Sequence, residues 1–351
     1  MEQLEIKLSK HLKEKPKSEN ELGFGHIFTD HMFLMEHSAE KGWHNAVVKP
    51  FEDFTLSPAA AVFHYAQTIF EGLKAYPGLR MFRPWDNMAR LQNSARRMCI
   101  PEFDEKFVLE AMYELVRVDK DWIPKMEGTS LYIRPTIMAV DPFLGVHASS
   151  SYYFFIILSP SGFYYADGVK PIKIFVEDTY VRAVIGGVGH IKAGGNYAAS
   201  IYAGDAATAK GYAQVLWLDA HEHRFVEEVG SMNIMFKING ELYTPPLRGS
   251  VLPGITRDST IRLAKDRGMT VHEEPIAIDE LYKASLDGSL EEVFGTGTAA
   301  VISSVGELTW KDKKIVVNGG KMGQLTQELY DELTGIQYGK RPDKFGWTVQ
   351  L

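Results

Sequence analysis

The sequence predicts a mixed α/β or α+β fold with two domains. Short segments rich in β-branched and aromatic residues alternate with longer segments whose apolar residues recur at helical spacing, in both halves of the chain. A chain of 351 residues is longer than one hydrophobic core usually organises, and turn-forming residues cluster at 159–168. We therefore expect a small first domain over 1–160, an interdomain loop at 161–171 and a larger second domain over 172–351.

The strands are predicted from short apolar runs bounded by turn-forming residues. In the second half, Asn239 and Gly240 separate two such runs, which predicts a hairpin because this dipeptide favours a two-residue turn. The expected strands cover 26–37, 79–82, 130–140, 150–159, 171–177, 214–220, 229–240, 241–247 and 290–294.

The helices are predicted from apolar residues at helical spacing and from residues typical of helix ends. Ser57 and Pro58 stand where an N-cap and a first helical residue belong, just before an apolar segment. Asp86 and Asp279 are candidate N-caps of two later helices. The expected helices cover 59–76, 87–99, 104–120, 256–268, 280–286 and 323–339.

The overall composition excludes several classes of partner. The formal net charge of −7 disfavours nucleic acid, because proteins that neutralise phosphates usually carry a basic surface. The single cysteine, Cys99, excludes a disulfide framework and a CxxC metal or redox pair. The longest apolar run, at 152–158, is too short to span a bilayer, and residues 1–20 lack the apolar core of a secretion signal. We expect a cytoplasmic protein without nucleic-acid or membrane partners.

One lysine lies in an unusual setting. Lys192 is flanked by two pairs of glycines in IGGVGHIKAGGNYAAS, a segment with almost no other charge. A lysine most often extends from a surface loop into water. The alternative is a nucleophilic amine, because burial lowers the pKa of a lysine and glycines let a bulky cofactor approach the backbone. A P-loop is excluded, because Ile191 and Ala193 occupy the positions of its glycine and hydroxyl.

Acidic residues and small-residue loops downstream form a second group of candidates. Glu227 and Glu228 form either a solvated turn or a site in which one carboxylate faces a protonated pyridine nitrogen. The segment 252–259 begins a helix, whose free amides and dipole attract phosphate, and 294–300 offers another anion-binding loop. The second loop also matches a dinucleotide fingerprint, but neither a helix nor a suitably spaced acid follows it.

A short polar cluster has the residue types of a metal site. His221, Glu222 and His223 lie in a turn between two predicted strands, with no further partner at useful spacing. We interpret them as a solvated loop and expect no metal.

Long motifs follow one another along nearly the whole chain. In order they are FGHIFTDHM, HYAQTIFEGLKAY, RMFRPWDNMARL, LYIRP, GGVGHIKAGGNYAAS, EEVGSMNI, LPGITRDS, EVFGTGTAAV and LTGIQYG. Together they resemble the branched-chain amino acid aminotransferases, pyridoxal-phosphate enzymes of fold type IV. The resemblance implies two domains with the active site in the cleft between them, and reversible transamination of L-leucine, L-isoleucine and L-valine with 2-oxoglutarate. A D-amino acid transaminase or an aminodeoxychorismate lyase of the same fold is the alternative.

The resemblance implies the residues that bind pyridoxal 5'-phosphate. Lys192 corresponds to the lysine that binds the cofactor covalently and later acts as the base. Glu228 corresponds to the carboxylate that keeps the pyridine nitrogen protonated, and Tyr197 to the hydroxyl beside the phenolic oxygen. Ser231 and Asn233 are further candidates nearby. The cofactor's phosphate is expected to bind Arg90, Ile255, Thr256 and Thr296.

The resemblance also implies a substrate pocket. Thr298 and Ala299 correspond to backbone donors for the substrate α-carboxylate. Arg134 and Tyr132 are expected to bind the second carboxylate when glutamate takes the place of leucine. The aromatic wall is expected to comprise Phe24, Tyr65, Phe70, Tyr132 and Tyr164.

A homodimer is implied as well. Leu144, Gly145 and Val146 correspond to a loop that reaches into the active site of the neighbouring subunit. Some relatives carry a CxxC pair where this chain has Ala300 and Ser303, so a thiol switch is not expected here.

Overall fold

The computed structural model describes residues 3–162 and 170–351, and the chain divides into two compact units. Unit 1 comprises Met1–Ala166, Lys192–Gly194 and Ile336–Leu351, and unit 2 comprises Asp167–Ile191 and Gly195–Gly335. The expected domain limits placed 192–194 and 336–351 in the second domain. Backbone pairing with strands of unit 1 accounts for both differences, as described below. Most of the expected interdomain loop at 161–171 lies outside the described residues.

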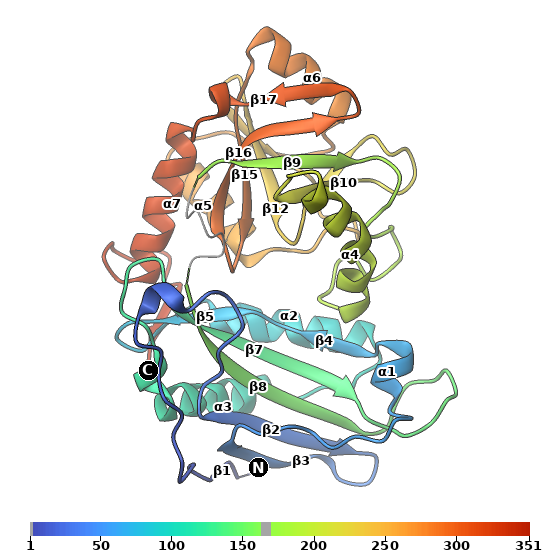
Figure 1. Ribbon diagram of the computed structural model, residues 1–351, viewed down its shortest axis with the longest axis vertical. Coiled ribbons are helices and arrows are strands. Elements are labelled where there is room, and N and C mark those ends of the chain that lie inside the picture. The colour runs from blue at the N-terminus through green and yellow to red at the C-terminus, as the bar shows by residue number, and fades with distance from the viewer. Residues whose placement is uncertain (1–2, 163–169) are drawn as a thin grey trace. The chain divides into compact units, whose positions relative to one another are not determined.

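Unit 1 is built on a nine-stranded sheet (Figure 1). The strand order is β1-β3-β2-β8-β7-β5-β6-β18, and β4 pairs with β7. The two long central strands, β7 and β8, run antiparallel over their whole length. The strands are β1 (Glu5–Ile6), β2 (His31–Ser38), β3 (Gly42–Pro50), β4 (Thr68–Phe70), β5 (Leu73–Tyr76), β6 (Arg80–Phe82), β7 (Ser130–Ala139), β8 (Tyr152–Ser161) and β18 (Thr348–Gln350).

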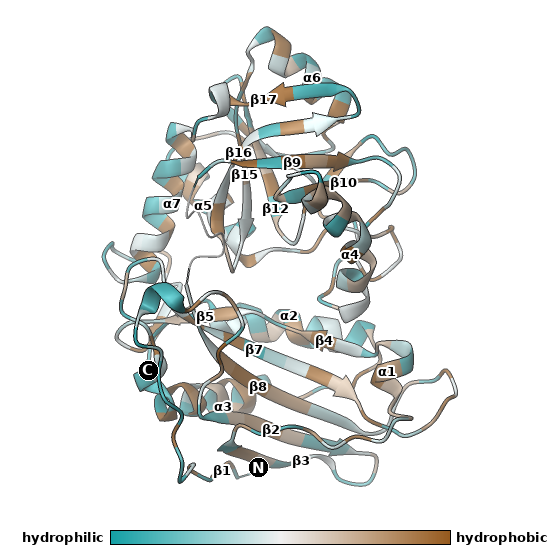
Figure 2. Cartoon of the chain, in the orientation of Figure 1, coloured by the Kyte–Doolittle hydropathy of each residue, from teal (hydrophilic) through white to brown (hydrophobic). Residues whose placement is uncertain are grey.

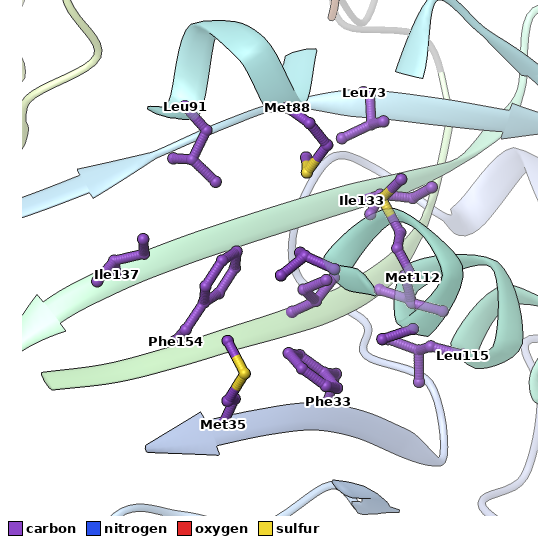
Figure 3. Packing of buried hydrophobic residues seen from close by; sticks show 14 of the residues in the cluster. Phe33, Met35, Leu73, Met88, Leu91, Met112, Leu115, Ile133, Ile137 and Phe154 are labelled. Carbon is purple, nitrogen blue, oxygen red and sulfur yellow. The ribbon is translucent and has the colours of Figure 1, made fainter. Parts of the chain in front are cut away.

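Helices α2 (Pro84–Arg97) and α3 (Glu105–Val118) supply the core over one face of this sheet (Figure 3). Side chains alternate between faces along a strand, so Leu131 and Ile133 of β7 enter this core. Tyr132 and Arg134 therefore project from the opposite face. Much of β8 has a hydrophobic colour in Figure 2, and most residues of that strand are buried.

The prediction of a helix over 59–76 is wrong. Only α1 (Ala61–Tyr65) is helical there, and β4 and β5 follow it. Ala66 adopts a left-handed conformation (φ 49°) that ends the helix, and the next residues hydrogen-bond to β7. Long-range strand pairing thus overrides the local apolar spacing. Ser57 accepts a hydrogen bond in the preceding turn and does not cap the helix.

Two predicted helix caps are wrong, because the observed N-caps, Arg83 and Ala277, lie before Asp86 and Asp279. Helix α2 begins at Pro84, and Asp86 lies in its first turn and pairs with Arg83. Helix α6 (Ile278–Asp287) begins before Asp279, which pairs with Arg224. Strand β3 and helix α4 (Gly194–Ala209) were not predicted. The glycine-rich start of α4 and its weakly amphipathic sequence give no clear helical pattern.

Unit 2 also contains a nine-stranded mixed sheet, with strand order β11-β10-β9-β16-β15-β12-β13-β14 and β17 paired to β16. The predicted hairpin at Asn239 and Gly240 is confirmed by β12 and β13. Ile278 and Leu281 of α6 belong to the hydrophobic core of this sheet, and α4 packs on Val215 and Trp217 of β10. The strands are β9 (Ile172–Glu177), β10 (Gln214–Leu218), β11 (Val226–Val229), β12 (Asn233–Ile238), β13 (Glu241–Thr244), β14 (Val271–Glu273), β15 (Leu290–Gly297), β16 (Val301–Trp310) and β17 (Lys313–Val316).

The remaining elements are helices α5 and α7, in the second half of the chain, and short 3-10 helices. Helices α5 and α7 are linked by Arg267, which follows α5 and forms ion pairs with Glu328 and Glu332 of α7. In the described ranges, no helix is long and apolar enough to cross a membrane. The elements are α5 (Ile255–Asp266), α7 (Gln324–Gln337), and the 3-10 helices Glu19–Glu21, Lys120–Trp122 and Asn318–Gly320.

Candidate active site

The backbone of Lys192 is fixed to the first unit by strand-like contacts. Its carbonyl accepts a hydrogen bond from the Phe70 amide at 3.1 Å, and Ala193 forms a bridge with Ile69. Lys192 Nζ lies 4.8 Å from the centre of the Phe70 ring. A side chain at Gly194 would collide with Thr68, so glycine is needed for this close approach.

An ion pair with a fully buried carboxylate lies next to this lysine. Glu71 directly follows Phe70 and accepts two hydrogen bonds from Arg90, at 2.7 and 2.8 Å. Asn87 donates a third at 2.8 Å. Burial alone would raise the pKa of Glu71, but the charges and hydrogen bonds of Arg90, together with the charge of Lys192, hold that pKa below its usual value. Glu71 is therefore ionised between two cations.

Four predicted pocket residues meet on the polar face of the sheet in unit 1. Arg134 Nη2 donates to the Tyr132 hydroxyl at 3.0 Å, and its guanidinium lies 4.6 Å from the Phe70 ring centre. Phe24 contacts Tyr132 edge-on, with 5.0 Å between ring centres. Arg134 Nε is buried and has no hydrogen-bond partner in the described part of the chain. An anion there would satisfy it.

Two further predicted residues of unit 1 lie close together. The Tyr65 hydroxyl donates to the Leu144 carbonyl at 2.5 Å. The side chains of Leu144 and Val146 are 67% and 84% exposed, which is unusual for two neighbouring aliphatic residues. Tyr164 lies outside the described residues.

In unit 2, Glu228 forms an ion pair with one arginine and accepts two hydrogen bonds. It lies in β11 and is 3% exposed. Its Oε2 atom lies 3.0 Å from Arg182 Nε, and Oε1 accepts from the Leu252 amide at 2.7 Å. Asn233 donates to the same Oε1 at 3.3 Å. Arg182 is fixed in turn by the carbonyls of Gly189 and Ser250.

Glu228 lines a cavity of about 140 Å³ within unit 2. The volume is close to that of an engineered cavity of about 150 Å³ that holds a benzene ring, so a six-membered aromatic ring would fit. Tyr197 and Ser231, both predicted from sequence, line the same cavity. The other lining residues are Arg182, Asn196, Ser200, Gly204, Gln214, Val215, Trp217, Gly230 and Leu252.

The predicted phosphate-binding residues of unit 2 surround the start of α5. Ile255 and Thr256 are the first residues of this helix, where the amides lack partners within the helix. Gly254 packs so closely on the Asn233 side chain that a Cβ would overlap it. Asn233 is paired with Thr296, whose buried hydroxyl has no partner among the residues described. The helix dipole, the amides of the first helical turn and the unpaired Thr296 hydroxyl together suit a phosphate.

The remaining predicted residues lie in a hairpin turn. Thr298 and Ala299 occupy the turn between β15 and β16, next to Thr296. Both are partly exposed. No group of three His, Cys, Asp or Glu side chains within 3–162 and 170–351 is arranged to hold a metal ion.

Three buried charged residues were not predicted to take part in the site. Glu71 is an acid within the apolar segment TIFEGL, and Arg182 is an isolated cation in TYVRAVIGG. A buried charge needs a partner, so an acid or arginine in an apolar segment is the signal that could have identified them. Glu227 is the third, and the sequence offered a solvated turn as one interpretation of Glu227 and Glu228, but both side chains are buried.

The chain was compared with known proteins. Residues 68–308 match the amino-transferase class IV family. Branched-chain-amino-acid aminotransferase 2 of Bacillus subtilis (strain 168) is 56% identical over 342 residues, covering 96% of this chain and 94% of the relative. The crystal structure of Escherichia coli branched-chain amino acid aminotransferase matches with a TM-score of 0.77 and 30% identity, covering 91% of this chain and 98% of that one.

A further solved structure contains a derivative of the cofactor. It is the T.th. branched-chain amino acid aminotransferase complexed with N-(5'-phosphopyridoxyl)-L-glutamate, with a TM-score of 0.75 and 29% identity over 90% of this chain and 97% of that one. The α+β architecture of this chain is that of the fold type IV aminotransferases. This chain belongs to the amino-transferase class IV family, and it is an enzyme.

Replacing Glu227 by glutamine should remove a pH dependence of stability. Burial raises the pKa of Glu227 to about 7, although the Ser250 hydroxyl and the charge of Arg182 act against this rise. The folded protein thus holds this proton more tightly than the unfolded chain, whose pKa is near 4.5. Stability should fall as pH rises from about 4.5 through about 7. Glutamine mimics the protonated acid and does not ionise.

Urea unfolding at about pH 5 and about pH 8 measures this effect. The Glu227→Gln variant should be more stable than the unaltered protein at the higher pH, by on the order of 2 kcal/mol, with little difference at the lower pH. The exposed Glu222 provides the control, and Glu222→Gln should change neither value. If the free energy of unfolding fell equally between the two pH values in the unaltered protein and in Glu227→Gln, folding would not raise the pKa of Glu227.

Proposed function

We propose that this enzyme is a branched-chain amino acid aminotransferase that uses pyridoxal 5'-phosphate. It transfers the amino group of L-leucine, L-isoleucine or L-valine to 2-oxoglutarate, reversibly and in two half-reactions. The observation that carries the proposal is Lys192, a lysine fixed at its backbone beside the buried Glu71 and Arg90 pair. The Bacillus subtilis relative of that name, 56% identical, supports the substrate class.

The residues of the chain fit the cofactor's functional groups. The amine of Lys192 would attach it, and the guanidinium of Arg90, the amides of Ile255 and Thr256 and the hydroxyl of Thr296 would bind its phosphate. The unpaired Thr296 hydroxyl supports this assignment, since no residue in the described ranges bonds to it. When bound, the cofactor supplies an electron-withdrawing ring that stabilises negative charge at the substrate Cα.

Each remaining catalytic role belongs to a side chain with a suitable setting. Lys192 Nζ removes the proton from the substrate Cα and holds it for return. Glu228 would hold a proton on the ring nitrogen as an ionised group, because Arg182 and the Leu252 amide favour the carboxylate. The Tyr197 hydroxyl would bind the ring's phenolic oxygen.

The substrate pocket must accept both an aliphatic and an acidic side chain. Phe24, Phe70 and Tyr132 offer apolar surface to leucine, and Arg134 Nε offers an unsatisfied donor to the second carboxylate of glutamate. The backbone amides of Thr298 and Ala299 bind the α-carboxylate. Tyr65 completes the aromatic wall, and Tyr164 is assigned to it from the family resemblance alone.

Two exposed residues are assigned to a contact with a second copy of the chain. The exposed Leu144 and Val146 would be buried against a second subunit, so a homodimer with shared active sites is expected. The exposed Ile201 and Tyr202 of α4 are consistent with a further apolar contact. The protein is assigned to the cytoplasm, in keeping with its single cysteine.

Replacing Lys192 by alanine should abolish cofactor attachment and activity. The unaltered protein should absorb in the near-ultraviolet or visible range, with a band that shifts on addition of L-leucine and returns with 2-oxoglutarate. Lys192→Ala should lose the attached chromophore, and the rate should fall by about 10⁴-fold or more, because both nucleophile and base are removed. Lys210 is a matched control, because its Nζ also lies over an aromatic ring, that of Phe175 at 4.6 Å.

The control and the alternative reactions complete this test. Lys210→Ala should retain colour and activity, and borohydride reduction followed by peptide mapping should place the label on Lys192. A fully active Lys192→Ala protein would refute the assignment. Turnover of D-alanine without L-leucine, or release of pyruvate from aminodeoxychorismate, would identify the D-amino acid transaminase or the lyase instead.

Replacing Arg134 by glutamine should separate the two kinds of substrate. Loss of the charged donor should lower kcat/KM for 2-oxoglutarate by about 10-fold to 100-fold, because a hydrogen bond to a charged group contributes about 1.5–3 kcal/mol. The L-leucine half-reaction should change less than about threefold. Arg117→Gln, on α3, is the control. Equal losses with both substrates would indicate a general role for Arg134.

Replacing Leu144 and Val146 together by aspartate should weaken the dimer. Two buried like charges at an apolar interface carry a large desolvation penalty. Sedimentation equilibrium should show a dimer for the unaltered protein and monomer for the double variant. Leu286 on α6 is equally exposed, at 69%, and Leu286→Asp should leave the dimer intact. A monomeric unaltered protein would rule out the shared site.

A further inference from the structure

We propose that Glu71 is a positioning residue that orients Arg90 toward the cofactor's phosphate and places a fixed negative charge beside Lys192. This inference rests on the proposed function, because it assigns Arg90 and Lys192 to the same cofactor. Glu71 itself touches neither substrate nor cofactor in this role. It links the two groups that hold opposite ends of that molecule.

The hydrogen bonds of Glu71 define one orientation of Arg90. Arg90 Nε donates to Oε1 and Nη2 donates to Oε2, so both carboxylate oxygens and one edge of the guanidinium are used. A two-point contact between planar groups fixes rotation as well as distance. Asn87 Nδ2 also donates to Oε2 and to the Gly72 carbonyl, which fixes the carboxylate itself.

The backbone around Glu71 connects this pair to the lysine. The Glu71 amide donates to the Pro135 carbonyl of β7 at 2.8 Å, and the preceding Phe70 amide donates to Lys192. Two successive residues therefore join the central sheet and the lysine segment. Any displacement of Glu71 would shift the guanidinium and the lysine backbone together.

The charges around Glu71 have a chemical consequence. The cations that act on it are Arg90 of α2 and Lys192, and Asn87 contributes an uncharged donor. A nearby negative charge favours the protonated form of an amine, or of an imine formed from it. Glu71 should therefore stabilise positive charge on the nitrogen that joins the bound cofactor to position 192.

A second arginine of α2 forms a similar ion pair at the surface, where no carboxylate has to be buried. Arg96 pairs with Glu102 through two bonds of 3.0 Å, with the same two-point geometry, but both side chains are exposed. Burying a carboxylate carries a desolvation cost that an exposed pair avoids. The buried position of Glu71 is thus explained by what Arg90 and Lys192 must do. Glu102 also provides a matched control.

The test compares Glu71→Gln with Glu102→Gln in protein reconstituted with pyridoxal 5'-phosphate. Glutamine keeps the shape but removes the charge and one acceptor for Arg90. Glu71→Gln should bind the cofactor at least about 10-fold more weakly in a fluorescence titration, since a charged hydrogen bond is lost. The pH midpoint of the bound cofactor's absorbance change should fall by about one unit. Glu102→Gln should match the unaltered protein in both measurements.

A double-variant cycle covers the case in which Glu71→Gln fails to fold, because a lone Arg90 would remain buried. Arg90→Gln and the Glu71→Gln/Arg90→Gln double variant remove that charge. Adding Glu71→Gln to the Arg90→Gln variant should weaken cofactor binding by less than about threefold, since Glu71 acts through Arg90. The absorbance midpoint should still fall by about one unit between these two variants.

The outcomes distinguish this inference from the proposed function. An unaltered protein that does not take up pyridoxal 5'-phosphate would overturn the function itself. An unaltered protein that does, with a Glu71→Gln variant of equal affinity and midpoint, would overturn the role of Glu71. Coincident midpoints for Arg90→Gln and the double variant would do the same.

Discussion

The backbone hydrogen bond from Phe70 to Lys192 is the constraint on which the arrangement of unit 1 around the lysine depends. With the Ile69–Ala193 bridge, it adds the lysine segment to the edge of β4 as if it were a short strand. Backbone pairing of this kind needs close approach, which explains the glycine that follows at position 194. A flexible side chain, with a large entropy when free, is thereby anchored at its base. Only its outer bonds remain to be positioned.

Each unit holds a buried carboxylate that is paired with an arginine of the same unit. Glu71 is neutralised by Arg90 in one unit, and Glu228 by Arg182 in the other. In both cases a neighbouring asparagine also donates a hydrogen bond to the carboxylate. The low dielectric of a protein interior makes such groups costly when unpaired and strongly oriented when paired. The two carboxylates are thus held in defined positions by the fold itself.

Local patterns predicted the features that depend on neighbouring residues. The Asn239–Gly240 turn and the helix predicted over 104–120, observed as α3, depend mainly on short-range contacts, and the sequence predicted both. The segment 59–76 was not, because its apolar spacing suits a helix while its partner strand β7 lies far along the chain. The same holds for the site. Lys192, Glu228 and Glu71 all belong to long motifs, but the pairing of Glu71 with Arg90 and of Glu228 with Arg182 is defined only by the fold.

The placement of β18 affects how the molecule is made. This strand, at 348–350, pairs with β6 at 80–82, while all of unit 2 is encoded between them. A ribosome delivers residues in order, and domains tend to fold as they emerge. Unit 1 must therefore wait with an incomplete sheet edge while about half of the polypeptide is still being synthesised. Nascent chains of this protein would expose that edge to chaperones until release.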